Sequence, residues 1–316
     1  MAFNGKIAFV FPGQGSQHVG MGKDLLSNHL PRTKELFQEG SNAIGLDLER
    51  LCLEGPEWEL TLTANAQPAI LLVSLTAFFA LRAEGIEPDF VAGHSLGEYS
   101  ALVAAGAFRF TDAIRIVRKR GLFMQEAVPP GQGAMAAILG LSREVVQAVC
   151  QEAASSGVVE MANVNAPSQV VIAGEVKAVE AAVRFAQAKG GRAKLLQVSA
   201  PFHCTLIQPA SEKLAQFLQG VIIEDLKIPL ITNVDAEFIT TAREVRDALV
   251  RQVTSLVLWE ESIRRLTQEG VRIFVEVGPG QILSGLIKRI ERGASTYHVD
   301  DTTSLHTTVN VLKGIG

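Results

Sequence analysis

The stretch Gly93-His94-Ser95-Leu96-Gly97 decides how this chain folds and what it does. An apolar run, Phe90–Ala92, precedes it and predicts a strand, and the helix-forming residues Glu98–Ala105 follow it. A serine between two glycines at a sharp strand-to-helix turn has an exposed hydroxyl, and the backbone amides that follow converge near it. We therefore expect Ser95 to be a nucleophile. An ordinary tight turn with a solvated serine is the alternative that the pattern leaves open.

The composition favours a soluble globular protein. The chain has 316 residues, 47% of them hydrophobic, and its 29 basic and 33 acidic residues give a net charge of −4, which argues against a general nucleic-acid binder. The longest apolar stretch, residues 69–81, is shorter than the ~20 residues of a membrane span and predicts a buried helix. The N-terminus has no basic lead of the signal-peptide kind. We expect a cytoplasmic protein that binds no membrane.

The cysteines indicate neither a disulfide framework nor a metal site. Cys52, Cys150 and Cys204 are an odd number, are widely spaced and form no C-x-x-C pair. We expect three reduced thiols and no bound metal. Cys204 follows a histidine directly, but neighbouring residues in an extended chain point to opposite sides, so its sulfur is not expected to face that imidazole.

Alternating strands and helices predict a parallel sheet with helical crossovers in the first part of the chain. The same alternation resumes after residue 200. The strands expected are 6–11, 90–93, 228–232 and 272–277, and the helices are 67–84, 98–105, 111–126, 206–218, 244–253, 260–268 and 281–290. Residues 1–130 and 200–316 are therefore expected to form one large α/β domain.

Between these two parts the order of elements changes to β-α-β-β-α-β. The expected strands are 134–139, 158–164, 169–173 and 193–199, and the helices are 143–153 and 176–189. This order is typical of a ferredoxin-like unit, which returns to its starting point and can be inserted into another domain. Residues 131–199 are therefore expected to form a small α+β domain, with a cleft between it and the large one.

A serine hydroxyl needs a positioned base before it can act as a nucleophile at neutral pH. His94 is adjacent to Ser95 and is expected to point away from it. His203 follows a strand and a Pro-Phe turn where the chain re-enters the large domain, so it can reach over the cleft. For any single histidine, a structural role is the alternative. The remaining histidines considered lie in polar or C-terminal segments: His29, His298 and His306.

The glycine-rich segments do not fit nucleotide-binding motifs. Gly13-x-Gly15 is followed by His18 where G-x-G-x-x-G needs its third glycine, and the chain has no P-loop lysine. A glycine turn at the end of a strand instead brings Gln14 close to a reacting centre. Gln14 and the amide of Leu96 are candidates for an oxyanion hole. A glycine turn without a catalytic role is the alternative.

Together, these motifs resemble the malonyl-CoA:acyl carrier protein transacylases of bacterial fatty acid synthesis. The resemblance spans nearly the whole chain. It rests on Phe11-Pro-Gly-Gln-Gly-Ser-Gln17, Gly93-His-Ser-Leu-Gly-Glu-Tyr-Ser-Ala-Leu102, Arg120-Gly-Leu-Phe-Met-Gln125, Asn163-Val-Asn-Ala-Pro167, Gln169-Val-Val-Ile-Ala-Gly174, Pro201-Phe-His203, Val250-Arg-Gln252 and Glu276-Val-Gly-Pro-Gly280. The fold it implies is an α/β-hydrolase-like core with an inserted ferredoxin-like subdomain.

The resemblance also implies roles for individual residues. Ser95 is the acylated nucleophile, His203 is the general base, and the backbone carbonyl at Gln252 orients that imidazole in place of a carboxylate. The amides of Gln14 and Leu96 form the oxyanion hole. Around the substrate, Arg120 binds the free carboxylate of malonate, and the bulky ring of Phe202 leaves no room for methylmalonyl. Asn163 and Met124 complete the substrate-binding residues that the resemblance implies.

The resemblance further implies partners. Malonyl-CoA is the substrate, no cofactor is permanently bound, and acyl carrier protein accepts the acyl group. Because carrier proteins are acidic, we expect exposed basic residues near the cleft to dock the carrier. The candidates are Lys189, Arg192, Lys194, Lys288 and Arg289, although a charged cluster is more often simply a solvated helix face. We expect the enzyme to act as a monomer.

Three alternatives remain at this stage. A serine hydrolase would pair Ser95 with a late acid and His298, the chain order of α/β-hydrolases. A stand-alone acyltransferase of a polyketide pathway would have the same motifs. A non-catalytic scaffold that binds carrier proteins would retain the fold without the reaction.

Overall fold

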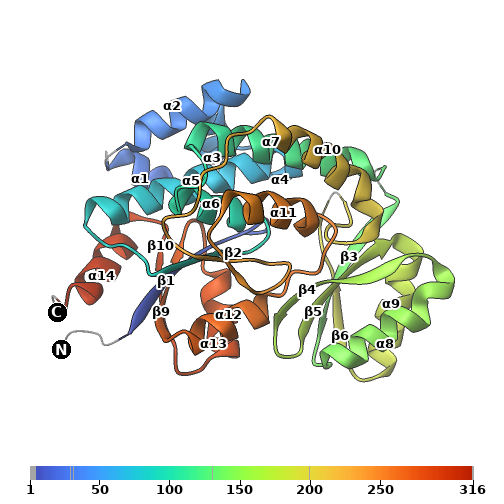
Figure 1. The fold of residues 1–316 in the computed structure, drawn as a ribbon. Helices are drawn as coiled ribbons and strands as arrows, with labels where there is room; N and C mark the ends of the chain where they lie inside the picture. The colour runs from blue at the N-terminus through green and yellow to red at the C-terminus, as the bar shows by residue number, and fades with distance from the viewer. Residues whose placement is uncertain (1–4, 29, 31, 130, 199, 315–316) are drawn as a thin grey trace.

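The computed structural model describes residues 5–28, 30, 32–129, 131–198 and 200–314. Within them the chain forms two sheets, each packed against helices (Figure 1). The larger sheet has six strands in the order β10-β9-β1-β2-β7-β8. Their bounds are β1 (Lys6–Phe11), β2 (Phe90–Gly93), β7 (Leu230–Ile231), β8 (Phe238–Ile239), β9 (Val271–Val277) and β10 (Ser295–Val299). Neighbouring strands are parallel except β7 and β8.

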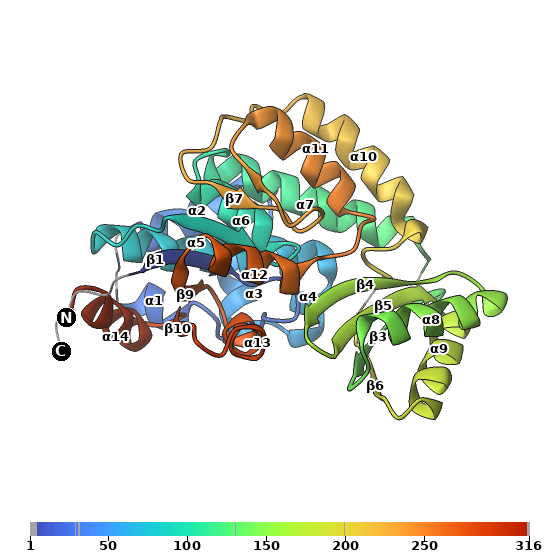
Figure 2. The same cartoon turned by 60° about the horizontal axis from the view of Figure 1, so that its bottom comes forward.

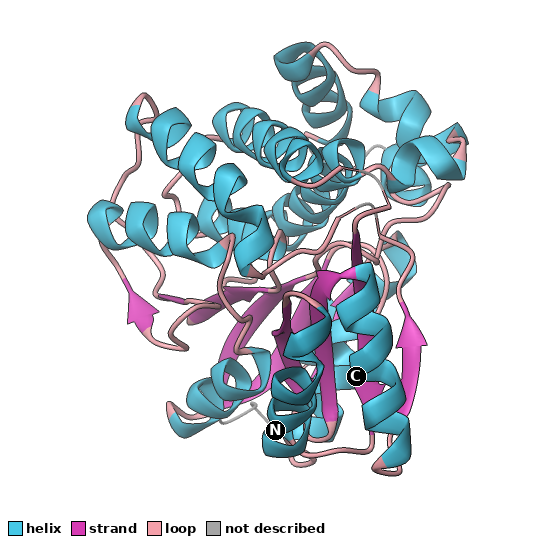
Figure 3. Cartoon of the chain, turned by 90° about the vertical axis from the view of Figure 1, so that its right-hand side faces the viewer, coloured by secondary structure: helices cyan, strands magenta, loops and turns pink. Residues whose placement is uncertain are grey.

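Helices cover both faces of this sheet, as the layers in Figure 3 show. The helices of this part of the chain are α1 (Lys23–Ser27), α2 (Thr33–Ile44), α3 (Leu48–Glu54), α4 (Glu57–Thr61), α5 (Thr63–Ala83), α6 (Gly97–Ala104), α7 (Phe110–Ala127), α10 (Gln208–Gln219), α11 (Ala242–Gln252), α12 (Trp259–Gln268), α13 (Ile282–Ile290) and α14 (Thr302–Leu312). Successive side chains of a strand point to opposite faces. Phe9 and Phe11 therefore join the core that includes α5, while Ala8 and Val10 pack in a second core with Trp259.

Helix α5 is the central helix of the first core. It is long and apolar enough to cross a membrane, but 94% of its most apolar window is buried inside the protein. A helix that is apolar all round is typical of a buried position as well as of a membrane span. The burial of α5 against the sheet and α7 accounts for its composition, as the sequence predicts.

The second sheet is formed within residues 133–195 and has the strand order β4-β5-β3-β6. Its elements are β3 (Gly133–Leu139), α8 (Arg143–Ala153), β4 (Val159–Ala166), β5 (Gln169–Glu175), α9 (Val176–Ala188) and β6 (Arg192–Leu195). The described pairs are all antiparallel, and α8 and α9 pack together on one face (Figure 2). This is the strand order of a ferredoxin-like unit, so the predicted fold class is confirmed.

Backbone hydrogen bonds join β4 of the smaller sheet to the segment just before α12, which belongs to no strand of the larger sheet. The amide of Val257 donates to the Ala162 carbonyl over 2.9 Å, and the amide of Val164 donates to the Val257 carbonyl over 2.9 Å. Because these bonds bracket Asn163, they fix this part of β4 against the larger unit. The segment that carries Asn163 and Asn165 is thereby held at the boundary between the two sheets.

Several element bounds differ from the prediction. Helix α5 begins four residues early, at Thr63, and β7 has only two residues because the chain pairs briefly before it turns into β8. Strand β6 ends at Leu195, and Leu196 and Val198 line the central pocket instead of continuing the sheet. The last predicted residue of that strand, Ser199, lies outside the described residues. Helices α1–α4 and α14 and strands β8 and β10 were not predicted.

Candidate active site

The turn between β2 and α6 places Ser95 at the carboxyl edge of the larger sheet. Ser95 has a φ of 49°, in the left-handed region that non-glycine residues rarely adopt. Both flanking glycines are required by space. A Cβ at Gly93 would lie 1.9 Å from the carbonyl carbon of Gly97, and a Cβ at Gly97 would lie 2.0 Å from the Phe11 oxygen. The turn therefore has the close-packed geometry of a nucleophile elbow.

His203 contacts this serine. Its Nε2 lies 2.7 Å from Ser95 Oγ, and its Nδ1 lies 2.9 Å from the backbone oxygen of Gln252. Since a carbonyl can only accept, Nδ1 carries the proton, and Nε2 is left to accept from the serine hydroxyl. Burial, followed by the positive charge of Arg120, lowers the pKa of His203 to about 3. The imidazole is therefore neutral at physiological pH and able to take a proton.

Arg120, on α7, is the cation of the site and is only 2% exposed. Its Nη2 donates to Ser95 Oγ over 3.1 Å and to Gln252 Oε1 over 2.9 Å, and its Nη1 donates to Gln67 Oε1 over 2.9 Å. All of these acceptors are neutral oxygens. Burial lowers the pKa of Arg120, yet a guanidinium stays protonated at neutral pH. A buried cation held by neutral groups next to a nucleophile is suited to binding an anionic substrate.

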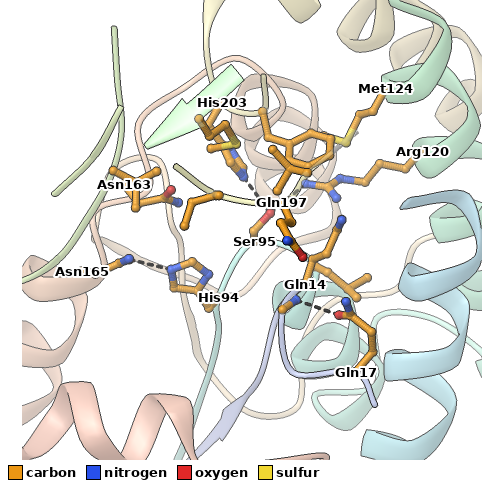
Figure 4. A pocket seen from close by; sticks show the side chains of 17 residues that line it. Gln14, Gln17, His94, Ser95, Arg120, Met124, Asn163, Asn165, Gln197 and His203 are labelled. Carbon is orange, nitrogen blue, oxygen red and sulfur yellow. Dashed lines mark hydrogen bonds between the residues drawn. The ribbon is translucent and has the colours of Figure 1, made fainter. Parts of the chain in front are cut away.

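A cavity of about 320 Å³ opens beside these groups. Figure 4 shows Ser95 between His203 and Arg120, with the other lining side chains around them. Several of the predicted residues line it together: Gln14, Ser95, Leu96, Arg120, Met124, Asn163, Phe202 and His203. The structure thus brings most of the predicted site residues together in one pocket. Gln252 is fully buried behind it and reaches Ser95 through its side chain, since Nε2 donates to the Ser95 carbonyl over 3.1 Å.

The donors near Ser95 restrict where an oxyanion can bind. The amide of Ser95 is already engaged, since it donates to Asn233 Oδ1 over 2.6 Å. Leu96 is the N-cap of α6, where backbone amides have no acceptor within the helix. Gln14 lies across the pocket, and its side-chain oxygen accepts from the Thr63 hydroxyl. Because the Ser95 amide is engaged, the amide of Leu96 is the remaining candidate donor on the serine side.

The predicted docking residues lie outside this pocket, and all five are exposed. Lys189 pairs with Glu152 over 3.3 Å, and Arg289 donates to Gln169 Oε1 over 2.6 Å. Arg192 and Lys194 lie on β6, while Lys288 lies on α13. The five docking residues are therefore divided between the two units: Lys288 and Arg289 belong to the larger one, and Lys189, Arg192 and Lys194 to the smaller one.

The other candidates for the base and the nucleophile do not contact Ser95 Oγ in the described structure. His298 is in β10, where its Nε2 contacts Gln281 over 2.9 Å and Asp300 over 3.6 Å. Cys204 is buried, its thiol donates to the Pro201 carbonyl over 3.1 Å, and burial raises its pKa to about 12. Cys204 is therefore a core thiol that is protonated at neutral pH, and its sulfur is hydrogen-bonded to Pro201. His94 turns to Asn165, where Nε2 lies 2.8 Å from Oδ1.

Four residues that position the site through hydrogen bonds were not predicted from the sequence. Gln67 positions Arg120, Asn165 positions His94, and Asn233 and Glu98 hold the backbone around Ser95. Two signals were available in the sequence. Glu98 is the only charged residue of α6, and Asn233 directly follows the strand expected at 228–232, at the carboxyl end where α/β sheets place functional groups.

Comparisons with known proteins agree with this geometry. The family model of the acyl transferase domain matches residues 8–305. The malonyl CoA-acyl carrier protein transacylase of Bacillus subtilis (strain 168) is 48% identical over 310 residues, which cover 98% of each chain. The protein of that name from Escherichia coli (strain K12) is 47% identical over 287 residues, 90% of this chain and 93% of the relative.

Solved structures of similar sequence have the same fold. The acyl-carrier-protein S-malonyltransferase of Burkholderia pseudomallei 1710b superimposes with a TM-score of 0.94 at 46% identity, covering 96% of this chain and 99% of the other. A malonyl-transacylase solved in complex with a type II PKS acyl-carrier protein gives a TM-score of 0.94 at 45% identity, covering 97% and 99%.

Proposed function

Because the chain belongs to the acyl transferase domain family, we propose that it moves the malonyl group of malonyl-CoA to the phosphopantetheine thiol of acyl carrier protein. The transfer passes through a malonyl ester on Ser95. The observation that carries this proposal is the contact between Arg120 Nη2 and Ser95 Oγ, at 3.1 Å. A buried guanidinium at that distance binds the free carboxylate of a short diacid whose other end is esterified to the serine.

In the first half-reaction, Ser95 Oγ attacks the thioester carbonyl carbon of malonyl-CoA while its proton passes to Nε2 of His203. The Gln252 carbonyl accepts from Nδ1 and stabilises the imidazolium that forms. The amides of Leu96 and Gln14 donate to the oxyanion, each donor contributing ~2.7–4 kcal/mol by analogy with characterised oxyanion holes. The C–S bond then breaks, and the imidazolium gives its proton to the leaving CoA thiolate, which departs as the thiol.

The second half-reaction repeats these roles in the opposite direction. The phosphopantetheine thiol gives its proton to His203 and attacks the ester carbonyl carbon. The bond from this carbon to Ser95 Oγ breaks, and Oγ regains the proton from the imidazolium. Both half-reactions therefore use the same base, and no cofactor takes part in either step. Throughout, Arg120 holds the free carboxylate, and Phe202, Asn163 and Met124 shape the pocket around the acyl group.

The acceptor we propose is a carrier protein of fatty acid synthesis, and a polyketide carrier is the second candidate. The second candidate is favoured by the similar structure solved with a type II PKS carrier. In either case the acidic carrier docks on Lys288 and Arg289 of one unit and on Lys189, Arg192 and Lys194 of the other. We also expect the enzyme to act as a monomer in the cytoplasm.

A transfer assay tests the proposal. Malonyl-CoA and phosphopantetheinylated carrier protein are incubated with the enzyme, and malonyl carrier is separated from unloaded carrier and quantified. We expect transfer by the wild type, loss of transfer in His203→Ala, and retention in the matched variant His298→Ala. Loss in His298→Ala with retention in His203→Ala would support the serine hydrolase order instead. Absence of transfer by the wild type would contradict the proposal.

A further inference from the structure

Asn233 holds the backbone on both sides of Ser95. Its Oδ1 accepts from the Ser95 amide over 2.6 Å, and its Nδ2 donates to the Gly93 carbonyl over 2.6 Å. Asn233 is 1% exposed and follows β7, which neighbours β2 in the sheet. One side chain thus bridges Gly93, the first residue of the elbow, and Ser95. A serine at positive φ is strained, and such strain persists only where surrounding contacts determine it.

Glu98 in turn holds Asn233. Its Oε2 accepts from the Asn233 amide over 2.8 Å, and the carboxyl is 1% exposed within α6, the helix that begins just after Ser95. The contacts form a closed ring from Ser95 through Glu98 and Asn233 back to Ser95. Burial raises the pKa of Glu98 to about 7, and the hydrogen bonds with the Asn233 backbone and the Gln252 side chain, followed by the charge of Arg120, oppose that rise. Burying a carboxyl lowers the free energy of unfolding unless other contacts compensate for it. A role in positioning Ser95 gives a reason for keeping Glu98 at this buried position.

Neither residue lines the pocket or contacts Ser95 Oγ through its side chain. Their hydrogen bonds therefore act on the reaction through the position of the serine backbone, and a charged Glu98 also attracts the guanidinium of Arg120. By occupying the Ser95 amide, Asn233 also leaves the amide of Leu96 to the oxyanion. We propose that Glu98 and Asn233 are a positioning pair, in which the Glu98 carboxyl fixes Asn233 and Asn233 fixes the strained backbone of Ser95 in its reactive geometry. This inference rests on the proposed role of Ser95 as the nucleophile.

The test uses a probe that needs the nucleophile but not the substrate's carboxylate. An aryl sulfonyl fluoride is attacked by Ser95 Oγ, a bond from oxygen to sulfur forms, fluoride leaves, and the serine proton passes to His203. The second-order rate of Ser95 labelling is measured by intact mass for the wild type and for Asn233→Ala, Glu98→Ala, Glu98→Gln and the double alanine variant. Circular dichroism of each variant gives the folded fraction to which its rate is normalised.

We expect Asn233→Ala and Glu98→Ala each to slow labelling about tenfold or more, the effect of removing a buried hydrogen bond of this kind. Because the two residues act in series, the double variant should match Asn233→Ala within about twofold. Glu98→Gln should recover most of the rate, since an amide oxygen can still accept from Asn233. Ser100→Ala is the matched control: Ser100 is on the same helix, fully buried and without a partner among the described residues, and its rate should be unchanged.

Wild-type rates in folded Asn233→Ala and Glu98→Ala, or additive losses in the double variant, would overturn the inference. So would a Glu98→Gln rate as low as that of Glu98→Ala. Failure of the wild type to label at Ser95 would overturn the nucleophile itself, and the positioning pair with it. Since malonyl-CoA is absent from this experiment, a failed positioning role is distinguished from a failed malonyl transfer.

Discussion

Arg120 Nη2 donates to Ser95 Oγ over 3.1 Å, so the cation proposed to bind the malonyl carboxylate is in direct contact with the proposed nucleophile. The serine oxygen accepts from Arg120 and donates to His203, so both of its partners hold it in place. An incoming carboxylate gives the guanidinium a charged acceptor within the same pocket. Substrate binding and activation of the serine are thereby coupled through one side chain.

Replacing Arg120 should reduce the preference for malonyl. In Arg120→Gln the free carboxylate loses its cation, and the ratio of Ser95 acylation by malonyl-CoA to acylation by acetyl-CoA should fall roughly ten- to a hundredfold. Arg120→Lys should give an intermediate ratio, because lysine keeps the charge but not the planar pair of donors. Competition between the two CoA thioesters, read by intact mass, measures this ratio. An unchanged ratio in Arg120→Gln would contradict the assignment.

The rate of Ser95 acylation should stay constant as the pH falls from neutrality to about 5. A base acts only when unprotonated, and the pKa of His203 is lowered to about 3. The acid limb of kcat/KM for malonyl-CoA should therefore lie well below pH 5, whereas an ordinary histidine base would lose about tenfold per pH unit below 6.5. Rapid-quench acylation rates measure this profile. Glu98, with its pKa of about 7, is the second group that can titrate here, so the profile is repeated with Glu98→Gln.

The lowered pKa of His203 also makes the stability of the protein depend on pH. An unfolded histidine binds a proton near pH 6.5, while His203 in the folded protein binds one only near pH 3. Within this window the unfolded chain carries the extra proton, so the free energy of unfolding should fall as the pH decreases. Urea unfolding of the wild type and His203→Gln at several pH values checks this. The slope between pH 6.5 and pH 4 should be smaller in the variant, and equal slopes would count against a buried neutral imidazole.

Gly97→Ala should disrupt the elbow. The new Cβ would lie 2.0 Å from the Phe11 oxygen, a backbone atom that cannot move without shifting β1. We expect a loss of several kcal/mol, of the order of an overpacked core, or failure to fold. Gly285→Ala, in an exposed part of α13 with nothing within 4 Å of the new Cβ, is the matched control and should stabilise by about 0.5–1 kcal/mol. Thermal unfolding measures both, and a wild-type Tm for Gly97→Ala would contradict the geometry.

Reversing charge at the proposed docking residues should weaken the carrier half-reaction only. Lys288→Glu and Lys194→Glu should each raise KM for the carrier about two- to fivefold, the range for an exposed ion pair, and leave acylation by malonyl-CoA unchanged. Lys189→Glu should have less effect, because Lys189 already pairs with Glu152. Lys34→Glu, an equal charge change on α2, is the control. Equal losses in both half-reactions would refute the docking role.

The sequence predicted those parts of the site where local pattern and chemistry coincide. The elbow was predictable because Gly93 and Gly97 bracket a serine between an apolar strand and a helix, and the order of elements in residues 133–195 identified the inserted unit. His203 was placed over the cleft by its position at the return to the large unit. Arg120 needed the family resemblance, since an arginine in a basic helix looks solvated, although it is 2% exposed.

The parts that were not predicted depend on contacts between distant segments. Asn233 and Ser95 are separated by 138 residues and meet only because β7 pairs with β2. Gln67 reaches Arg120 across 53 residues because α5 packs on α7. Strand β6 was predicted too long, because residues 196–198 look extended and apolar but contribute to the pocket wall. Such pairings follow from topology and have no local sequence signal.

In the proposed reaction, Ser95 carries the malonyl group as an ester while Arg120 holds its carboxylate. Intact mass and peptide mapping after brief incubation with malonyl-CoA test it most directly. We expect one malonyl adduct on the peptide containing Ser95, absent in Ser95→Ala and removed when a phosphopantetheine thiol is added. No adduct on the wild type, or an adduct that persists in Ser95→Ala, would contradict it.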